Sequence, residues 1–311
     1  MAEIVISEFM DDASVDRIQK LHDTLYAPDL VDRPDDLAAA LGDARAWIVR
    51  NRTKVTGAML AHAPQLQCVG RLGVGLDNID LPACEARGVT VYPATGANDV
   101  AVAEYVVTTA LMLLRGSYGR SADVAAGKWP RQEMMGREGM DKRLGLVGYG
   151  AIARQVAARA RPYGFEIAAY DPFLPAGDPA WAGASSLDLA ELMATSDVVS
   201  LHVPLTERTR HLVGPDVLGT MKPGAILINT ARGGVVDEAA LCAALKDGQL
   251  GGAALDVFET EPLTAEAGAK FAGLANLILT PHIAGVTDES NIRVGIVTAD
   301  RVLAHLAGHS A

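Results

Sequence analysis

The stretch RLGLVGYGAIARQVAARARPYGFEIAAYDP, residues 143–172, decides the fold of this chain. It opens with a short apolar strand, Leu144 to Val147, and then breaks into the glycine-rich turn 148–150. Apolar residues next recur at helical spacing, Gly164 ends the helix, and a second strand over 166–170 runs into Asp171. A strand, a glycine-rich turn, a helix, a strand and an acid about 20 residues on are typical of a βαβ unit that binds a dinucleotide.

Each small residue of the turn has a physical reason. Gly148 permits a tight turn, and Gly150 lets the backbone approach a pyrophosphate, whose charge then lies at the N-terminus of the helix that begins at Ala151-Ile152. The third small position holds Ala153, which suffices because this residue only has to pack closely against the strand. An ordinary strand-to-helix turn is the alternative interpretation, and the order of the whole unit disfavours it.

The acid that ends the second strand indicates which dinucleotide binds. Asp171 can accept hydrogen bonds from both ribose hydroxyls but would repel a 2′-phosphate. The following Pro172-Phe173 supplies no arginine to neutralise such a phosphate. The sequence therefore predicts NAD as the cofactor, in preference to NADP.

Length and charge narrow the class of protein. At 311 residues with half of them apolar, the chain predicts two domains. A net charge of −11 disfavours nucleic acid and anionic membranes as partners, although a local arginine cluster can still bind an anionic substrate. The three cysteines lie far apart and the opening MAEIVISEF lacks a signal-peptide pattern, so we expect reduced thiols in a cytoplasmic protein.

Strands and helices alternate on both sides of the dinucleotide unit. Over residues 4–97 the pattern predicts strands at 4–7, 46–49, 68–72 and 89–92, and helices to about residue 25 and at 35–41, 55–61 and 81–87. Downstream it predicts strands at 197–201, 225–229, 252–257 and 277–280, and helices at 187–195, 238–247 and 287–306. Such alternation favours parallel sheets covered by helices, with ligands beyond the carboxyl ends of the strands.

One helix is apolar on nearly every face. It is predicted from Asp99 to about Arg115, with Asn98 as its N-cap, and it has too little polar surface for a helix in water. We therefore expect a homodimer built on this helix and its neighbours; burial inside one subunit is the alternative. The polar segment 116–142 that follows resembles a connection into the second domain.

Three polar residues that follow predicted strands carry the chemistry: Arg232, Glu261 and His282. Taken singly, each is better explained without a function, as a surface arginine, a solvated turn or an exposed loop histidine. Together they supply what oxidation of a 2-hydroxy acid needs. An arginine fork binds a carboxylate and polarises a carbonyl, a histidine moves the hydroxyl proton, and a carboxylate orients that histidine and favours its charged form. The cofactor takes the hydride.

Six motifs, in this order over nearly the whole chain, resemble the D-isomer-specific 2-hydroxyacid dehydrogenase family: GRLGVGLDNID (70–80), VGYGAIA (147–153), HVPLT (202–206), INTARGGVVDE (228–238), ALDVFETEPL (254–263) and TPHIAG (280–285). The resemblance implies an α/β fold of two doubly wound parallel-sheet domains. A Rossmann-type NAD-binding domain, residues 98–285, is inserted in a flavodoxin-like substrate-binding domain, residues 1–97 plus 286–311.

The resemblance also assigns roles to individual residues. It makes Arg232 the substrate-binding arginine, Glu261 the partner of the histidine and His282 the acid/base. The predicted substrate set is Arg50, Arg52, Val74, Gly75, Asn98, Arg232 and His282, and the resemblance places the backbone amides of Val74 and Gly75 on the substrate carboxylate. The cofactor set is Gly148, Gly150, Ala151, Ile152, Asp171, His202, Pro204, Thr209, Thr230, Ala231, Arg232, Asp256, His282 and Gly285, and no metal is implied.

Shorter segments indicate the branch of the family. IVRNRTKVT and GKWPRQ resemble phosphoglycerate dehydrogenases, and ISEFMDD with APDLVDRPDDL resembles (S)-sulfolactate dehydrogenases. Both branches imply a second anion on the substrate, which Arg50 and Arg52 could meet because they flank the end of one strand, with Arg71 at the end of another. The alternative is that these arginines are solvated charges paired with nearby acids.

We therefore expect interconversion of a small D-configured 2-hydroxy acid and its oxo acid, with (S)-3-sulfolactate and 3-sulfopyruvate favoured. The alternatives are 3-phosphoglycerate dehydrogenase and hydroxypyruvate or glyoxylate reductase. An alternative of another class is an NAD-sensing, corepressor-like binding protein, which the acidic chain does not favour. Adenosylhomocysteine hydrolysis uses a similar two-domain layout but does not fit the TARGG, ETEP and PHIAG segments.

Overall fold

The computed structural model describes residues 2–274 and 276–308, and the remaining residues of the two predicted domains (1, 275 and 309–311) lie outside it. The chain divides into two units, Met1–Asn98 with Val286–Ala311, and Asp99–Gly285. Asn98 therefore ends a segment of the first unit, although residues 98–285 are the predicted second domain.

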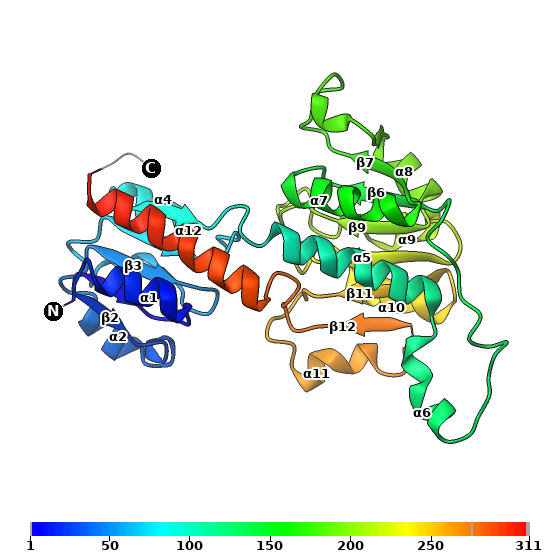
Figure 1. The fold of residues 1–311 in the computed structure, drawn as a ribbon, viewed down its shortest axis with the longest axis horizontal. Coiled ribbons are helices and arrows are strands. Elements are labelled where there is room, and N and C mark those ends of the chain that lie inside the picture. The colour runs from blue at the N-terminus through cyan, green and yellow to red at the C-terminus, as the bar shows by residue number, and fades with distance from the viewer. Residues whose placement is uncertain (1, 275, 309–311) are drawn as a thin grey trace. The chain divides into compact units, whose positions relative to one another are not determined.

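The first unit is built on a five-stranded parallel sheet with the strand order β2-β1-β3-β4-β5 (Figure 1). This is the flavodoxin-like order of a doubly wound sheet. The strands are β1 (Ile4–Ile6), β2 (Thr24–Tyr26), β3 (Ala46–Val49), β4 (Cys68–Arg71) and β5 (Thr90–Pro93). Helices α1 (Asp12–Gln19) and α12 (Asp288–Leu306) bury one face, and α2 (Pro34–Ala40), α3 (Gly57–Leu60) and α4 (Leu81–Ala86) bury the other.

Two elements of this unit differ from the prediction. The predicted helix to residue 25 ends at Gln19, and Thr24–Tyr26 is the edge strand β2 instead. Three residues with a half-exposed pattern are too few to show strand periodicity in the sequence, and only pairing with β1 fixes them as a strand. The predicted helix 55–61 shrinks to Gly57–Leu60, because Val55 forms a bridge to Ile79.

The second unit contains a seven-stranded parallel sheet of order β12-β11-β10-β9-β6-β7-β8. Its strands are β6 (Arg143–Val147), β7 (Glu166–Tyr170), β8 (Ser185–Ser186), β9 (Val198–Leu201), β10 (Ala225–Asn229), β11 (Leu250–Leu255) and β12 (Leu277–Leu279). Counted from β6, the order is that of a Rossmann sheet, with the reversal between β6 and β9. Helices α5 (Asp99–Arg115) and α7 (Ala151–Ala160) cover one face, and α8 (Leu189–Thr195), α9 (Pro215–Thr220) and α10 (Glu238–Lys246) cover the other.

Helix α5 has the predicted limits but a different environment. It packs against α7, β10 and β11, and its apolar residues join the core of its own unit. Asn98 does not cap it: the Asn98 Oδ1 is buried and has no hydrogen-bond partner among the described residues. No single described helix is long and apolar enough to cross a membrane, although α5 and residues 118–125, bent by 65°, pass that test together.

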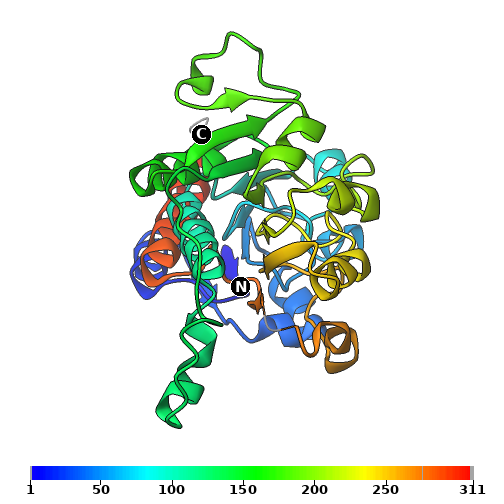
Figure 2. The same cartoon turned by 90° about the vertical axis from the view of Figure 1, so that its right-hand side faces the viewer.

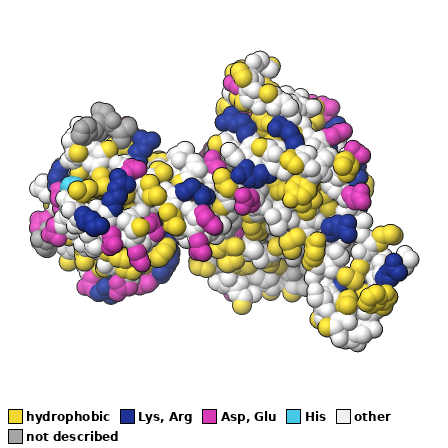
Figure 3. Space-filling view, viewed as in Figure 1, with side chains coloured by type: hydrophobic (Ala, Val, Ile, Leu, Met, Phe, Trp, Pro, Cys, Tyr) yellow, Lys and Arg dark blue, Asp and Glu magenta, His cyan; other side chains and the backbone are white. Residues whose placement is uncertain are grey.

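The segment 116–142 was predicted to connect into the second domain. In the structure it lies within the second unit, which already begins at Asp99. It contains α6 (Ser121–Ala125), which projects from the sheet of this unit (Figures 1 and 2). Apolar side chains gather on its surface (Figure 3), and the most exposed are Trp129 at 76% and Met135 at 78%. Exposed apolar surface therefore lies on this segment and much less on α5.

Candidate active site

The β6–α7 turn has the geometry of an anion site. Gly148 has a φ of +87°, and a Cβ there would lie 2.6 Å from the His202 carbonyl oxygen, so only glycine fits. Gly150 is the N-cap of the ten-residue helix α7, makes no side-chain cap bond, and has open space where a Cβ would be. The first N–H groups of α7 thus remain open at the point where the strand order reverses. A pyrophosphate fits there.

Asp171 follows β7, at the same edge of the sheet. Its Oδ2 accepts a hydrogen bond from the Tyr149 N–H at 2.9 Å, and its Oδ1 accepts one from the Phe173 N–H at 2.9 Å. These two bonds hold the carboxylate beside the glycine-rich turn. Each oxygen still has room for another donor, such as a ribose hydroxyl.

The segment after β9 holds the next predicted cofactor residues. The His202 Nε2 lies 3.0 Å from the Ser200 Oγ, and burial lowers the pKa of His202 to about 4, so this ring is neutral at physiological pH. The Thr209 hydroxyl donates to the Pro204 carbonyl at 2.6 Å, which closes one turn over 204–209. Ala151 and Ile152 open α7 nearby in the fold, at the N-terminus that faces this edge.

The turn after β10 carries Thr230, Ala231 and Arg232. The buried Asn229 shapes it, because its side chain accepts from the Ala231 N–H at 3.0 Å and donates to the Arg232 carbonyl at 2.9 Å. The Thr230 Oγ1 is buried and has no hydrogen-bond partner among the described residues, so its hydroxyl is available to a bound cofactor. A Cβ on Gly233 would lie 1.7 Å from the Phe258 carbonyl oxygen. The Arg232 turn therefore packs directly on the segment that leads to Glu261.

Glu261 and His282 are in contact. The His282 Nδ1 lies 2.7 Å from the Glu261 Oε2, and the Glu261 Oε1 accepts from the Phe258 N–H at 2.9 Å. Burial alone would raise the pKa of Glu261. The hydrogen bonds from His282 and Phe258, with the charges of His282 and Arg232, outweigh burial and hold that pKa below its usual value. An ionised Glu261 keeps the proton on Nδ1, which leaves Nε2 to exchange a proton with a ligand.

Asp256 supports the loop that carries His282. It is 1% exposed, its Oδ1 accepts from the Ile283 N–H and its Oδ2 from the Ala284 N–H, both at 2.8 Å. The resemblance assigned Asp256 to the nicotinamide, and its bonding to this loop had no signal in the sequence. Gly285, the last cofactor residue predicted, closes the same loop and ends the unit.

A second buried acid supports the loop that carries Glu261. Glu238 is 3% exposed, accepts from the Glu259 N–H at 2.7 Å and pairs with the Lys270 Nζ at 2.5 Å. Sequence reasoning passed over Glu238 because it reads as an ordinary first-turn acid of α10.

In the first unit, one buried acid holds the loop after β3. Glu8 is 4% exposed, and its carboxylate accepts from the N–H groups of Arg50 at 2.8 Å, Arg52 at 3.0 Å and Thr53 at 2.9 Å. No sequence pattern indicates this role of Glu8 either.

The two arginines of that loop have different surroundings. The Arg50 Nη2 donates to the Asn291 Oδ1 at 2.7 Å, and its guanidinium lies 5.7 Å from the centroid of the Phe9 ring. Burial lowers the pKa of Arg50 from its usual value. Arg52 instead forms an ion pair with Asp32, and both side chains are more than half exposed. Arg52 is thus a solvated, paired charge, the alternative given above for both arginines, whereas Arg50 pairs with no acid side chain among the described residues.

The loop after β4 carries Val74 and Gly75 and is tied to the Arg50 loop. The Asn78 Nδ2 donates to the Arg50 carbonyl at 3.0 Å and to the Thr53 carbonyl at 2.6 Å. Arg71 turns back on its own loop, where its Nη1 donates to the Leu72 carbonyl at 2.6 Å. Val74, Gly75 and Arg50 therefore gather at one edge of the sheet, and Asn98 ends the first segment of this unit.

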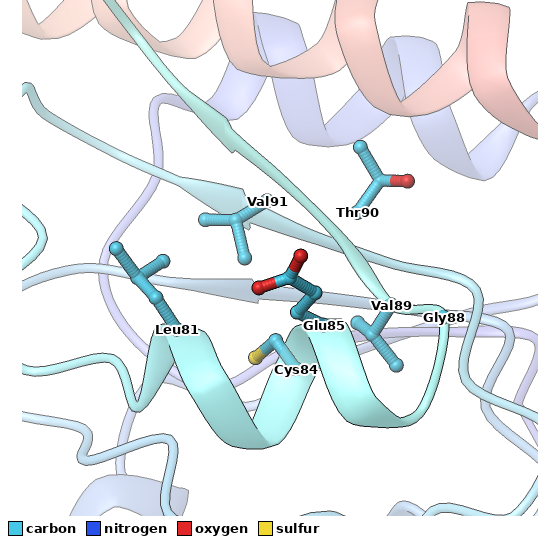
Figure 4. A pocket seen from close by; sticks show the side chains of 7 residues that line it. All are labelled: Leu81, Cys84, Glu85, Gly88, Val89, Thr90 and Val91. Carbon is cyan, nitrogen blue, oxygen red and sulfur yellow. The ribbon is translucent and has the colours of Figure 1, made fainter.

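Other features lie away from these residues. A surface hollow of the first unit (Figure 4) lies at the amino end of β5 and is lined by Leu81, Cys84, Glu85, Gly88, Val89, Thr90 and Val91, none of which is a predicted site residue. Across residues 2–274 and 276–308, no group of three or more His, Cys, Asp and Glu side chains is placed to hold a metal. The three cysteines are buried, free thiols.

Comparison with known proteins places this arrangement in a family. Residues 107–284 match the model described as D-isomer specific 2-hydroxyacid dehydrogenase, NAD binding domain. The chain belongs to the D-isomer-specific 2-hydroxyacid dehydrogenase family. It is an NAD-dependent oxidoreductase that acts on 2-hydroxy acids.

Relatives and solved structures of the family resemble the whole chain. The (S)-sulfolactate dehydrogenase of Chromohalobacter salexigens is 53% identical over 303 residues, which cover 97% of each chain. The hydroxypyruvate reductase of Thermotoga maritima is 39% identical over 88% of each chain. The crystal structure of D-lactate dehydrogenase from Aquifex aeolicus, complexed with NAD and lactic acid, is 31% identical with a TM-score of 0.85, covering 98% of this chain and 95% of that one.

Proposed function

We propose that this dehydrogenase interconverts a D-configured 2-hydroxy acid with a second anionic group and its 2-oxo acid, with (S)-3-sulfolactate and 3-sulfopyruvate as the favoured pair. The observation that carries the proposal is the placement of Arg50: its guanidinium is partly buried, and its backbone carbonyl is hydrogen-bonded to Asn78 of the loop proposed to bind the substrate carboxylate. The 53% identity to a sulfolactate dehydrogenase supports the same choice.

In the proposed mechanism, residues of the second unit bind the substrate at its reacting carbon and transfer the proton. Arg232 binds the carboxylate and carbonyl of the acid through its planar fork. His282 removes the hydroxyl proton at Nε2 during oxidation and returns it during reduction, while Glu261 holds the opposite ring nitrogen. NAD, when bound, accepts or supplies the hydride. The open N-terminus of α7, Asp171 and the Thr230 hydroxyl are the groups that would hold it.

Residues of the first unit would fix the rest of the substrate. The backbone amides of Val74 and Gly75 would bind the carboxylate, and Arg50 would bind a sulfonate or phosphate at C3. Stacking on Phe9 and the bond to Asn291 hold the Arg50 side chain in place, so less entropy is lost when an anion binds. Because the Asn291 bond involves a single donor, other N–H groups of the fork remain for the anion.

We expect Arg50→Ala to lower kcat/KM for the dianionic acid by roughly 10- to 100-fold, since a charge-assisted contact contributes about 1.5–3 kcal/mol. The same change should matter little for D-lactate or D-glycerate, which lack the second anion. The measurement is initial rate at 340 nm with sulfolactate, 3-phosphoglycerate, D-glycerate and D-lactate.

Arg52→Ala is the matched control, because it removes a neighbouring charge that already pairs with Asp32. It should leave the ranking of the four acids unchanged. A wild-type preference for D-lactate or D-glycerate would overturn the dianion proposal and favour a hydroxypyruvate or glyoxylate reductase. A preference for 3-phosphoglycerate would assign the other anion. Turnover of no acid in the panel would favour an NAD-sensing binding protein.

We further propose that the protein is a cytoplasmic homodimer, but not one built on the helix 99–115 as predicted from the sequence. Because α5 is largely buried in its own unit, the exposed apolar side chains of segment 116–142 support association instead, among them Trp129 and Met135. Light scattering at micromolar concentration should give twice the 32.6 kDa of one chain. The single-chain mass would exclude the dimer. The double substitution Trp129→Ser and Met135→Ser should weaken association without lowering activity per site.

A further inference from the structure

Tyr105, on the buried helix α5, is linked by hydrogen bonds to the loop that carries His282. Its hydroxyl lies 2.6 Å from the Thr280 Oγ1, and the Thr280 hydroxyl donates to the Asp256 Oδ1 at 2.6 Å. Thr280 directly follows β12, and Asp256 directly follows the neighbouring strand β11. All three residues belong to the second unit.

The direction of these bonds follows from proton counting. A threonine hydroxyl has one proton, and the carboxylate of Asp256 can only accept. Thr280 therefore gives its proton to Asp256, and Tyr105 must donate to Thr280. Burial raises the pKa of Tyr105, so the phenol keeps its proton and remains a donor throughout the working pH range.

The acceptor at the end of this chain is a buried carboxylate. Asp256 has no ion-pair partner in the described part of the chain, and its hydrogen bonds come from Thr280, the Ile283 N–H and the Ala284 N–H. Burying such a group is costly unless donors compensate it. Each donor in a buried network also strengthens the next, so Tyr105 supports the bond from Thr280 to Asp256.

The loop needs this support because His282 has a φ of +55°, in the left-handed region that residues with a Cβ rarely adopt. Such a backbone persists only where its surroundings fix it. The two N–H groups that Asp256 binds belong to the two residues directly after His282. Asp256 therefore fixes the backbone on one side of the ring, while Glu261 fixes the ring itself.

We propose that Tyr105 is a positioning residue for His282, acting through Thr280 and Asp256 on the backbone of the loop 280–285. The inference rests on the proposed role of His282 as the proton-transferring group, but it does not depend on which acid is the substrate. Tyr105 does not contact the reacting atoms in this scheme; it sets how often the His282 ring is correctly placed.

The test is Tyr105→Phe, which removes only the hydroxyl. We expect kcat to fall about 5- to 10-fold, as for one buried hydrogen bond, with KM for the acid and for NAD within about twofold of wild type. Thr280→Val should have a similar effect because it breaks the same chain, and Thr280→Ser should restore turnover. Thr109→Val is the matched control on the same helix, since among the described residues the buried Thr109 hydroxyl bonds only to the backbone carbonyls of Tyr105 and Val106 and not to the Tyr105 hydroxyl.

A double-mutant cycle separates positioning from general damage to the fold. In a His282→Gln background, Tyr105→Phe should lower the residual kcat no further, because the residue it positions is gone. An equal loss in both backgrounds, or an unchanged kcat in Tyr105→Phe, would overturn the inference.

Hydrogen exchange gives a readout that needs no substrate. In the free protein, the amides of Ile283 and Ala284 should exchange about fivefold faster in Tyr105→Phe than in wild type or Thr109→Val. Unchanged exchange would also overturn the inference. If wild type oxidised no acid in the panel, the proposed function would fail while this measurement still decided the role of Tyr105.

Discussion

His282→Ala should lower kcat for hydroxy acid oxidation by about 10²- to 10⁴-fold, the usual contribution of a general base. The His282 Nδ1 lies 2.7 Å from the Glu261 Oε2, which orients the ring and leaves the Nε2 for proton transfer. Among the described residues of the loop 280–285, His282 is the only one with this arrangement. Binding of NAD, followed by quenching of protein fluorescence, should change little because the dinucleotide contacts proposed here lie mainly on other residues. Near-normal turnover in His282→Ala would show that another group transfers the proton.

We expect the pair of His282 and Glu261 to make the rates of oxidation and reduction depend on pH in opposite directions. Because the pKa of Glu261 lies below its usual value, its carboxylate is ionised at neutral pH, where it holds the Nδ1 of His282. Oxidation needs the neutral ring and should therefore speed up as pH rises, whereas reduction needs the protonated ring and should slow. The stability that the ionised Glu261 contributes is present at neutral pH and is lost as pH falls through its lowered pKa.

Glu261→Gln should move both pH profiles towards lower pH, because the amide carries no charge to stabilise an imidazolium. The loop offers a matched control in Glu259→Gln. The Glu259 carboxylate lies 3.1 Å from the Nε2 of a different histidine, His211, so its removal should leave both profiles in place. Profiles that shift equally in the two variants would contradict the assignment of Glu261.

The second large effect concerns the cofactor. We expect kcat/KM with NAD to exceed that with NADP by about 10²- to 10³-fold, since juxtaposed like charges cost several kcal/mol. The hydrogen bonds from the Tyr149 and Phe173 N–H groups hold the Asp171 carboxylate in place, so it cannot turn away from a 2′-phosphate. Asp171→Ser should reduce the ratio to about tenfold or less.

Glu166→Gln is the control for charge alone, because Glu166 lies at the opposite end of the same strand β7 and is exposed. The ratio should stay at its wild-type value in this variant. Equal kcat/KM values for the two cofactors in wild type would exclude the proposed role of Asp171.

Much of the fold could be predicted because it follows local patterns. Helix 99–115 and the strand 225–229 have the predicted limits, since one is a long apolar run and the other a short apolar run that starts after a glycine and ends at polar residues. The edge strand Thr24–Tyr26 could not be predicted, because three half-exposed residues have no periodicity and only pairing with β1 defines them. The environment of α5 likewise depends on the sheet it covers, which no local pattern specifies.

Some residues of the candidate site could likewise be predicted from the sequence, and others could not because only the fold brings them together. Glu261 and His282 could be paired from chemistry alone, because a histidine that transfers protons needs an orienting acid. Tyr105 and Asp256 could not be linked, since Tyr105 and Thr280 lie 175 positions apart and Tyr105 reads as a core aromatic. Arg50 and Arg52 look alike in sequence. They differ in the fold because Asp32, 20 positions from Arg52, pairs with that residue, whereas the Arg50 guanidinium contacts Asn291 and Phe9.

The Asn78 side chain has a consequence for substrate choice. Its two hydrogen bonds join the loop of Val74 and Gly75 to the loop of Arg50, so these loops cannot separate independently. A substrate bound as proposed would contact both, one at each end of its carbon skeleton. The first unit would then select a substrate by the distance between its two anionic groups. This distance is one atom shorter in sulfolactate, whose sulfur is bonded directly to C3, than in phosphoglycerate, whose phosphorus is bonded through an oxygen. Discrimination between these two acids would thus depend on a fixed distance between the two loops. It would be lost in a variant whose side chain at position 78 no longer bonded to the Arg50 loop.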